Sequence, residues 1–338
     1  MKLLIVGFGQ PGHMGHYLAS AATRLGLDYQ LIDAIQAEAS SRIWRSFYWR
    51  FRNKRPARLA EFGAHVLAVS AVMHPNFVLT TGCAALNRWH VERLRMLGTT
   101  VINYSTDDPW NPKFRAPWFL RTLPSYNAVF TPRRANIDDF RRCGLGAVHY
   151  LPFGYDPDVH RPWPKGRPTA APTDVMFVGG CDEDRIPLIN GLIDTGLDLA
   201  LFGGYWNHHA KTRRYWRGIA DQDTIRSASA AARICLCLTR RANRDGHTMR
   251  SFEAAAIGGC ILAEDTADHR ELFGPDDHAV RYFKTVPELV GQAKLLVADA
   301  DARHRLSSQL AERFSRSKHT YADRLTSMLR SLDRERYG

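Results

Sequence analysis

Short apolar segments and segments with helical spacing alternate along this sequence as far as residue 285. Residues 2–6 form an apolar run that ends in glycines, residues 13–25 have helical spacing, and residues 28–32 form a second apolar run before Asp33. Strands that alternate with helices build parallel sheets, because a crossover helix must return the chain to the same edge. The pattern therefore predicts an α/β fold with parallel sheets.

The alternation runs twice, once on each side of a proline-rich stretch. Residues 155–173 carry five prolines, few long apolar side chains and no periodicity, which is typical of a linker. Further strands are expected at residues 77–80, 100–104, 128–131, 148–151, 174–178, 197–202, 234–238, 260–263 and 279–283. We expect two Rossmann-like, doubly wound domains that face a cleft, divided as residues 1–155, a linker 156–172, residues 173–318, and a C-terminal helix 319–338 that crosses back to the first domain.

Length and composition place the chain among ordinary globular proteins. Its 338 residues are 45% hydrophobic and 24% charged, which excludes disordered, collagen-like and coiled-coil chains. The longest apolar runs are far shorter than the roughly 20 residues of a membrane span, and Met1 opens on a strand-like segment rather than a signal peptide. The six cysteines are scattered without a CxxC pair, so we expect them to be reduced and structural. We expect a cytoplasmic protein.

The charge points to an anionic partner. Lysine and arginine number 46 against 34 acidic residues, a formal charge of +12, and arginine outnumbers lysine 38 to 8. The planar guanidinium suits phosphates and carboxylates. Nucleotide phosphate, nucleic acid and an acidic membrane surface all remain open on charge alone.

A glycine-rich loop follows the first predicted strand. Gly7, Gly9 and Gly12 form a GxGxxG pattern before a predicted helix, and Asp33 ends the next strand, as in a dinucleotide-binding domain. However, Pro11 lies inside the turn, and Gly15 one turn later indicates a longer loop than the tight NAD turn. The loop is therefore either an NAD(P) site or a glycine-lined loop that admits another ligand.

A second constellation lies in the second half. A helix is expected to begin near Thr248, so the backbone around His247 and the helix dipole would attract an anion. Arg250 and Glu253 are three residues apart and share one helix face, which suits a diphosphate and a pair of ribose hydroxyls. The alternative is an Arg250–Glu253 pair on a solvated face. Because Phe252 and an alanine run indicate a largely buried helix, we favour a ligand role.

This constellation resembles the donor-binding helix and following strand of group 1 glycosyltransferases with the GT-B fold, and most of all the CgeB-like subgroup. The resemblance spans most of the chain. The segments that carry it are residues 250–265 with their continuation to 273, residues 103–108, residues 153–158, residues 178–180 and residues 319–324.

The resemblance implies a site for a nucleoside-diphosphate-sugar, UDP- or GDP-linked, used as a co-substrate with no cofactor. The glutamate equivalent to Glu253 binds the donor ribose, a second acid lies at the position of Asp245, and glycines and arginines meet the diphosphate. The implied donor site consists of Gly179, Gly180, Arg185, Asp245, His247, Thr248, Arg250 and Glu253. Enzymes with this fold commonly stabilise the leaving diphosphate without a metal. No metal ligand set is expected, since the adjacent His208 and His209 point in different directions.

Candidates for the catalytic base lie in the first half. Asp107 and Asp108 follow a predicted strand, and an inverting reaction would need an acid or histidine to deprotonate the acceptor hydroxyl. His13 and His16 after the glycine loop are rivals. Alternatively, Asp108 and Pro109 form a turn and Asp107 only binds acceptor hydroxyls. A retaining enzyme needs no such base, so the stereochemistry stays open.

Residues 42–58 hold seven basic residues, five aromatic residues and no acid. On a helix, Ile43, Phe47 and Phe51 align, with Trp44 and Tyr48 beside them. A basic helix with an aromatic face is typical of membrane-surface binding, which would bring the acceptor side to anionic lipid. Stacking of single-stranded nucleic acid and a core-packed helix with a solvated basic face are the alternatives.

We therefore expect an enzyme that moves a sugar from a nucleotide-sugar held by the second half to an acceptor hydroxyl held by the first. The acceptor would be a glycan, a lipid-linked molecule or a protein in surface glycan or glycoconjugate synthesis, with the enzyme cytoplasmic or peripheral to the inner membrane face. Two alternatives remain: an NAD(P)-dependent oxidoreductase using the Gly7–Gly12 loop, and a basic nucleic-acid-binding protein. Since most arginines belong on solvated surface, we do not expect nucleic acid as the partner.

Overall fold

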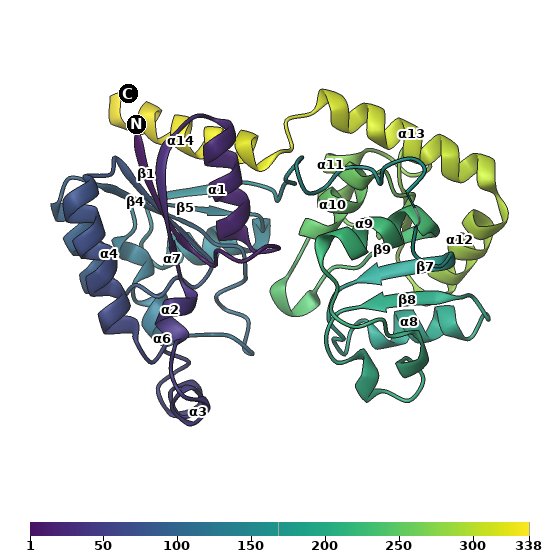
Figure 1. Cartoon of the computed structure of the whole chain (residues 1–338), viewed down its shortest axis with the longest axis horizontal. Coiled ribbons are helices and arrows are strands. Elements are labelled where there is room, and N and C mark those ends of the chain that lie inside the picture. The colour runs from purple at the N-terminus through teal and green to yellow at the C-terminus, as the bar shows by residue number, and fades with distance from the viewer. Residues whose placement is uncertain (168, 338) are drawn as a thin grey trace. The chain divides into compact units, whose positions relative to one another are not determined.

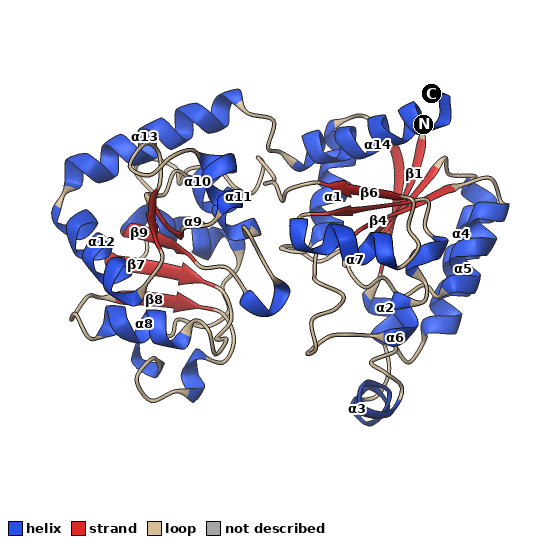
Figure 2. Ribbon diagram, turned by 180° about the vertical axis from the view of Figure 1, so that it is seen from behind, coloured by secondary structure: helices blue, strands red, loops and turns tan. Residues whose placement is uncertain are grey.

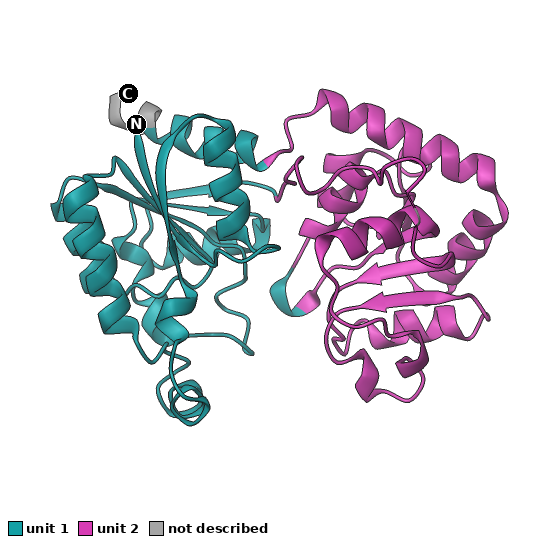
Figure 3. Ribbon diagram, in the orientation of Figure 1, with its two compact units in different colours: residues 1–152, 242–244, 321–338 teal, residues 153–241, 245–320 magenta. Residues whose placement is uncertain are grey.

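The chain divides into two compact units (Figure 3). The computed structural model describes residues 1–167 and 169–337, so Pro168 of the predicted linker and Gly338 of the predicted C-terminal helix lie outside the described residues. Unit 1 comprises residues 1–152, 242–244 and 321–338, and unit 2 comprises residues 153–241 and 245–320. Unit 1 therefore contains both ends of the chain and a short segment from the second half of the sequence.

Unit 1 is built on a six-stranded parallel sheet with the strand order β2-β1-β3-β4-β5-β6 (Figure 1). Helices cover both faces of a parallel sheet, so its strands are buried on both sides and read as continuous apolar runs. The strands are β1 (Lys2–Gly7), β2 (Asp28–Asp33), β3 (Phe77–Thr81), β4 (Thr100–Tyr104), β5 (Ala128–Thr131) and β6 (Ala147–Tyr150).

The helices of unit 1 include the last helix of the chain. α14 (Tyr321–Tyr337) lies beside α1 (Met14–Arg24) in Figures 1 and 2, and the rings of Tyr17 and Tyr321 stack with their centroids 5.2 Å apart. The other helices are α2 (Ile35–Glu38), α3 (Arg42–Phe51), α4 (Leu59–Met73), α5 (Arg88–Met96), α6 (Pro117–Leu120) and α7 (Ile137–Arg142). α14 thus completes the layer that α1 begins.

Unit 2 repeats this plan with five parallel strands in the order β11-β10-β9-β7-β8. In each sheet the first strand lies between the second and the third, so the chain reverses direction across the sheet between β1 and β3 and again between β7 and β9. Open α/β sheets bind ligands at the carboxyl ends of such strands. The strands are β7 (Thr173–Val178), β8 (Leu199–Phe202), β9 (Ala232–Cys237), β10 (Ile261–Glu264) and β11 (Arg281–Phe283).

One helix of unit 2 begins where the sequence predicts. α10 begins one residue after Thr248, which is its N-cap, and α8 (Ile186–Ile193) follows the Gly179–Gly180 loop. Gly258 ends α10 with φ +93°, a left-handed conformation that favours glycine. The other helices are α9 (Gln222–Ala231), α10 (Met249–Ile257), α11 (Ala267–Phe273), α12 (Val286–Ala298) and α13 (Ala300–Arg316).

The described residues of 156–172, within the proline-rich stretch, form no helix or strand, as their composition predicts. The stretch nevertheless packs against the rest of unit 2. The Arg226 guanidinium of α9 donates from Nε to the Arg161 carbonyl at 2.9 Å and from Nη2 to the Pro162 carbonyl at 3.1 Å. Asp156 and His160 are buried. The prolines therefore prevent regular secondary structure in this stretch, but the stretch still packs against its neighbours.

The expected fold class is confirmed, and the differences from the expected strands are small. β11 begins at Arg281 rather than residue 279 because Val280 pairs with Asp276 in a separate bridge. All six cysteines are free thiols, and burial raises the pKa of Cys235 to about 11. Within residues 1–167 and 169–337, none of the helices combines the length and apolar character that a membrane span requires.

Candidate active site

Two glycine loops meet at the carboxyl edge of the unit 2 sheet. Gly179 and Gly180 follow β7, and the loop after β8 begins at Gly203 with φ +130°. A Cβ at Gly203 would lie 2.4 Å from the Gly179 carbonyl oxygen, so the two backbones approach too closely for a side chain. At Gly180 a Cβ would meet only the Gly204 carbonyl oxygen, at 3.9 Å. Gly180 is therefore the more open position at this edge.

Arg185 holds the loops after β7 and β9. Its guanidinium is buried and donates from Nη1 to the Gly180 carbonyl at 3.0 Å and from Nη2 to the Leu238 carbonyl at 3.2 Å. Asp182 lies 3.3 Å from the same Nη1. Burial lowers the pKa of Arg185. The resemblance predicts Arg185 near a donor diphosphate; in the structure, Arg185 supports the loops after β7 and β9.

Arg240, which belongs to none of the sequence motifs, joins this cluster from the end of β9. Its Nε lies 2.9 Å from the Asp182 carboxylate, and its backbone N–H donates to Asp245 at 3.2 Å. The Arg240 side chain is about one-third exposed. Arg240 follows a buried strand beside the point where the strand order reverses. This position is the sequence signal that could have identified Arg240.

The Arg250–Glu253 pair is buried at its acidic end. Arg250 Nη1 forms an ion pair with Glu253 Oε2, and the Glu253 side chain is only 2% exposed, so the pair is not on a solvated face. The other oxygen, Oε1, has no hydrogen-bond partner among the described residues. A small cavity of about 30 Å³ lies against both side chains, which is room for an ordered water. A buried carboxylate with an unfilled acceptor position favours a ligand.

His160 of the proline-rich stretch is a second residue that sequence reasoning missed. Its Nδ1 accepts a hydrogen bond from the Asp156 backbone N–H at 3.0 Å, so the neutral ring carries its proton on Nε2. Nε2 lies 3.5 Å from Glu253 Oε1. Burial lowers the pKa of His160, which keeps the ring neutral at pH 7. No spacing in the sequence connects these residues, which are 93 positions apart.

His247 and Thr248 precede α10. The buried His247 ring accepts from the Phe153 N–H at Nε2, 3.2 Å away, and its Nδ1 lies 3.3 Å from the Asp268 carboxylate. Through these two contacts, the His247 side chain holds the loop before α10 in place. No side chain caps the N-terminus of α10, since the Thr248 hydroxyl contacts Ser251 instead. The first turn of α10 also contains no acid, which suits an anion.

In unit 1, the glycine loop differs from a tight dinucleotide turn. The helix α1 begins only at Met14, and the glycine that packs against the strand is Gly15, where a Cβ would lie 2.5 Å from the Phe8 carbonyl oxygen. The Asp33 carboxylate accepts from the Ile35 N–H at 3.0 Å. His16 lies in the first turn of α1 and is half-buried. The longer loop predicted from Gly15 is therefore present.

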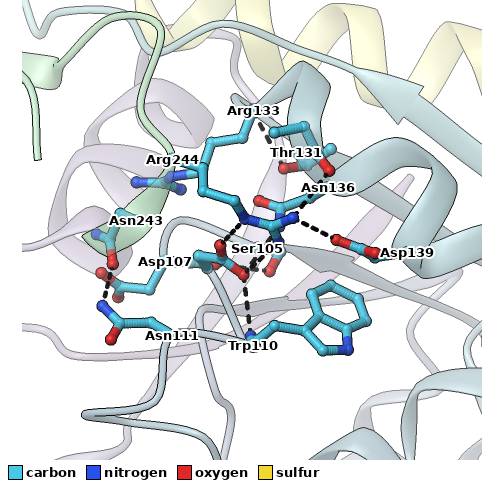
Figure 4. Close-up of polar contacts among 12 residues, drawn as sticks. Ser105, Asp107, Trp110, Asn111, Thr131, Arg133, Asn136, Asp139, Asn243 and Arg244 are labelled. Carbon is cyan, nitrogen blue, oxygen red and sulfur yellow. Dashed lines mark hydrogen bonds and ion pairs between the residues drawn. The ribbon is translucent and has the colours of Figure 1, made fainter. Parts of the chain in front are cut away.

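The two adjacent aspartates after β4 have different surroundings (Figure 4). Asp107 is exposed, and its backbone carbonyl accepts from the Ser105 hydroxyl at 3.2 Å. Asp108 is buried and accepts from the Trp110 N–H at 2.9 Å and the Asn136 amide at 2.8 Å. Of the two, Asp107 is the one accessible to an acceptor.

Arg244 completes the Asp108 network. Its guanidinium donates to both Asp108 oxygens, from Nε at 2.6 Å and from Nη2 at 3.0 Å, and its Nη1 lies 2.7 Å from Asp139. Figure 4 shows this side chain, and beside it the Asn243 side chain, which accepts from the Asn111 amide at 2.6 Å. Residues 242–244 belong to unit 1 through these contacts. Asp108 therefore supports the structure of the loop that carries Asp107.

No group of three or more His, Cys, Asp or Glu side chains that would hold a metal ion occurs in the part of the chain that the structure describes. The charges at the unit 2 edge are instead arginines and carboxylates.

Comparison with known proteins gives one family match and several similar folds. Residues 186–330 match the family model described as "Glycosyl transferase-like", which spans α8 to α14. None of the curated proteins matches the sequence.

Solved structures match nearly the whole chain at low identity. A sucrose-phosphate synthase from Thermosynechococcus elongatus is 14% identical with a TM-score of 0.71. The match covers 99% of this chain and 100% of the synthase chain. The Anabaena HepE protein in complex with UDP-glucose is 13% identical, with a TM-score of 0.68 and 98% and 99% coverage. The T4 phage BGT in complex with UDP-glucose is 14% identical, with a TM-score of 0.60 and 98% and 100% coverage. The chain thus has the two-domain, Rossmann-like GT-B fold, and its residues 186–330 match the glycosyl transferase-like family.

Proposed function

We propose that this protein is a glycosyltransferase that moves a sugar from a nucleoside-diphosphate-sugar held by unit 2 to an acceptor hydroxyl held by unit 1. The observation that carries the proposal is the buried Glu253 carboxylate: its Oε2 is paired with Arg250, and its Oε1, 3.5 Å from His160 Nε2, accepts no hydrogen bond among the described residues. A ribose hydroxyl would supply that hydrogen bond. The family match over residues 186–330 contains this helix.

The diphosphate would lie where the loops after β7 and β9 meet the N-terminus of α10. Gly180 leaves space for it, the backbone N–H groups of α10 face it, and Arg240 and Arg250 supply positive charge. These groups would stabilise the leaving diphosphate as its bond to the sugar breaks. We propose that they do so without a metal ion. HepE and BGT are described in complex with UDP-glucose, which supports UDP as the carrier, with GDP as the alternative.

For an inverting reaction, we propose Asp107 as the base that accepts the proton of the attacking hydroxyl. It is exposed at the carboxyl end of β4, whereas Asp108 is occupied by Arg244, Asn136 and the Trp110 N–H. His16 is the next candidate. We further propose a CgeB-like enzyme of surface glycan or glycoconjugate synthesis, acting in the cytoplasm, where free thiols such as its six cysteines are stable.

A thermal-shift panel of UDP, GDP, ADP, CMP and NAD tests the proposal. A ligand at about 100 times its dissociation constant adds about 2.7 kcal/mol to the stability of the state that binds it. For a unit of this size we expect the matching nucleoside diphosphate to raise Tm by at least about 5 °C. Stabilisation by NAD alone would favour the oxidoreductase alternative. Stabilisation by none of the five would contradict the proposal.

The His160 contact gives a separate prediction. Replacing His160 by alanine leaves Glu253 Oε1 without the nearby Nε2–H, so the carboxylate loses one of the two groups that orient it. We expect binding of the stabilising nucleotide to weaken by about 1–2 kcal/mol, roughly tenfold, in isothermal titration calorimetry.

The matched variant is His160→Gln, whose amide N–H can replace Nε2–H. It should retain most of the affinity. The ribose analogue lacking the 2′-hydroxyl provides a second readout, because the preference for ribose over 2′-deoxyribose should shrink in His160→Ala. Equal affinity and equal ribose preference in the wild type and His160→Ala would show that His160 only packs.

A further inference from the structure

The helix α3 exposes an unusual concentration of large apolar side chains. Ile43 is 81% exposed, Phe51 70% and Trp44 58%, and no residue of α3 is buried. Elsewhere on unit 1 such side chains, for example Trp89, are more dispersed along the sequence. Figures 1 and 2 show α3 projecting from unit 1 past α2 and α6. The helix is therefore not part of the core, and its apolar side chains serve another purpose.

The apolar side chains lie on one side of α3. Ile43, Phe47 and Phe51 follow each other at four-residue steps, with Trp44 and Tyr48 on the neighbouring arc. Their rings touch: the centroids of Trp44 and Phe47 are 5.8 Å apart, and those of Phe47 and Phe51 are 5.4 Å apart. We call Ile43, Trp44, Phe47, Tyr48 and Phe51 the aromatic face.

The opposite side of α3 attaches it to unit 1. The Trp49 ring packs edge-on against Phe114 with a centroid distance of 6.5 Å. Lys54, just after the helix, lies 5.8 Å from the Trp49 ring and donates to the Pro112 carbonyl at 3.1 Å. Because Trp49 faces unit 1, the aromatic face points away from it.

Basic side chains occupy other positions around α3 and in the segment that follows it. Residues 42–58 contain seven basic residues and no acid. Among the described residues, none of Arg42, Arg45 and Arg52 forms an ion pair with a carboxylate. A hollow of about 540 Å³ beside the helix is lined by basic and aromatic side chains, including Arg50 and Arg55, and by one acid, Glu38. Of the seven basic residues, Arg58 pairs with Glu61, so the surface combines exposed apolar area with an excess of positive charge.

This combination fits a lipid surface better than other partners. A second copy of α3 would bring like charges together, which opposes self-association. Nucleic-acid stacking uses flat rings, and the most exposed residue of the face is the aliphatic Ile43. An interfacial helix places its apolar face at the boundary of the acyl chains, while long arginine side chains reach the headgroup phosphates.

We propose that α3 docks unit 1 onto an anionic lipid bilayer, with the aromatic face inserted at the headgroup boundary and the long arginine side chains of residues 42–52 reaching lipid phosphates. If the proposed function holds, this orientation presents unit 1 to an acceptor carried by a lipid. The docking itself depends only on α3.

Vesicle co-sedimentation of the full chain tests the docking. We expect binding to vesicles of equimolar phosphatidylcholine and phosphatidylglycerol, weaker binding as salt rises, and at least tenfold weaker binding to phosphatidylcholine alone. Each basic residue near an anionic surface contributes about 1 kcal/mol, so the triple variant Arg42→Gln, Arg45→Gln, Arg52→Gln should bind roughly 100-fold more weakly. The triple variant Ile43→Ser, Phe47→Ser, Phe51→Ser should also lose at least tenfold.

Trp89→Ala is the matched control, because Trp89 is an exposed tryptophan of unit 1 outside α3, and it should bind like the wild type. Since α3 has no buried residue, all the variants should keep the wild-type Tm and its increase with the stabilising nucleotide. This separates failure of docking from failure of the donor site. The proposal would be overturned if the wild-type protein did not bind anionic vesicles, or bound oligothymidylate more tightly than these vesicles. Binding by both triple variants equal to that of the wild type would also overturn it.

Discussion

Replacing Glu253 by glutamine is expected to weaken binding of the stabilising nucleoside diphosphate by about 2–4 kcal/mol, roughly 30- to 1000-fold. The Oε1 atom of the carboxylate accepts a ribose hydroxyl in the proposed complex, and a charged acceptor contributes more to this hydrogen bond than an amide oxygen. If the glutamine amide keeps its oxygen on the Arg250 guanidinium, its N–H₂ group takes the Oε1 position, beside the His160 Nε2–H donor. Calorimetric titration of the full chain with the diphosphate measures the loss, and Arg250→Ala should act in the same direction.

Glu312→Gln is the control for this variant. Glu312 lies on α13, is 60% exposed and pairs with Arg316 one turn away, so its replacement should leave both the affinity and Tm nearly unchanged. If Glu253→Gln bound the nucleotide as tightly as Glu312→Gln does, Glu253 would not contact the ribose.

The neighbouring variants are expected to differ: Asp107→Asn should lower kcat, and Asp108→Asn should lower the stability of the fold. Asp107 is exposed, so Asp107→Asn should fold with a change in stability within about 0.5 kcal/mol, while kcat falls by about 10²- to 10⁴-fold if it is the base.

Asp108 is buried in the Arg244 network, so Asp108→Asn places an amide among donors. Breaking a buried pair costs about 3–5 kcal/mol, but Arg244 is 41% exposed, so we expect about 2–3 kcal/mol and a fall in Tm of several degrees.

Thermal melts and turnover of the donor that carries the stabilising nucleotide separate the two effects. A fully active Asp107→Asn would exclude Asp107 as the base and make His16→Ala the next test. An Asp108→Asn protein with wild-type Tm would show that the Arg244 contact adds no stability.

The strands were the most predictable part of the molecule. A strand of a parallel sheet is buried on both faces, so each appears in the sequence as an apolar run, and β4 and β5 have the predicted bounds. Glycines after such runs also locate the carboxyl edge, where open α/β sheets bind ligands. Gly179 and Gly180 are therefore expected at this edge, whereas the Arg250–Glu253 face follows from helical spacing, and the resemblance to glycosyltransferases implies a donor site for both.

The residues that orient the site could not be predicted in the same way. Arg244 and Asp108 are 136 positions apart, and His160 comes from a stretch that stands out only for its prolines. Periodicity reports which face of an element is buried, but not which distant element packs against it. The two roles of Asp107 and Asp108 likewise depend on a loop from the other half of the sequence.

Hydrogen exchange on the full chain, with and without the stabilising diphosphate at saturation, most directly tests whether unit 2 holds the nucleotide. We predict new protection in the loops at residues 179–185 and 239–241 and in the first turns of α10, with the Gly7–Gly15 loop unchanged, because backbone amides that bind phosphate exchange more slowly. Protection confined to the Gly7–Gly15 loop would place the nucleotide in unit 1 and contradict the proposed donor site.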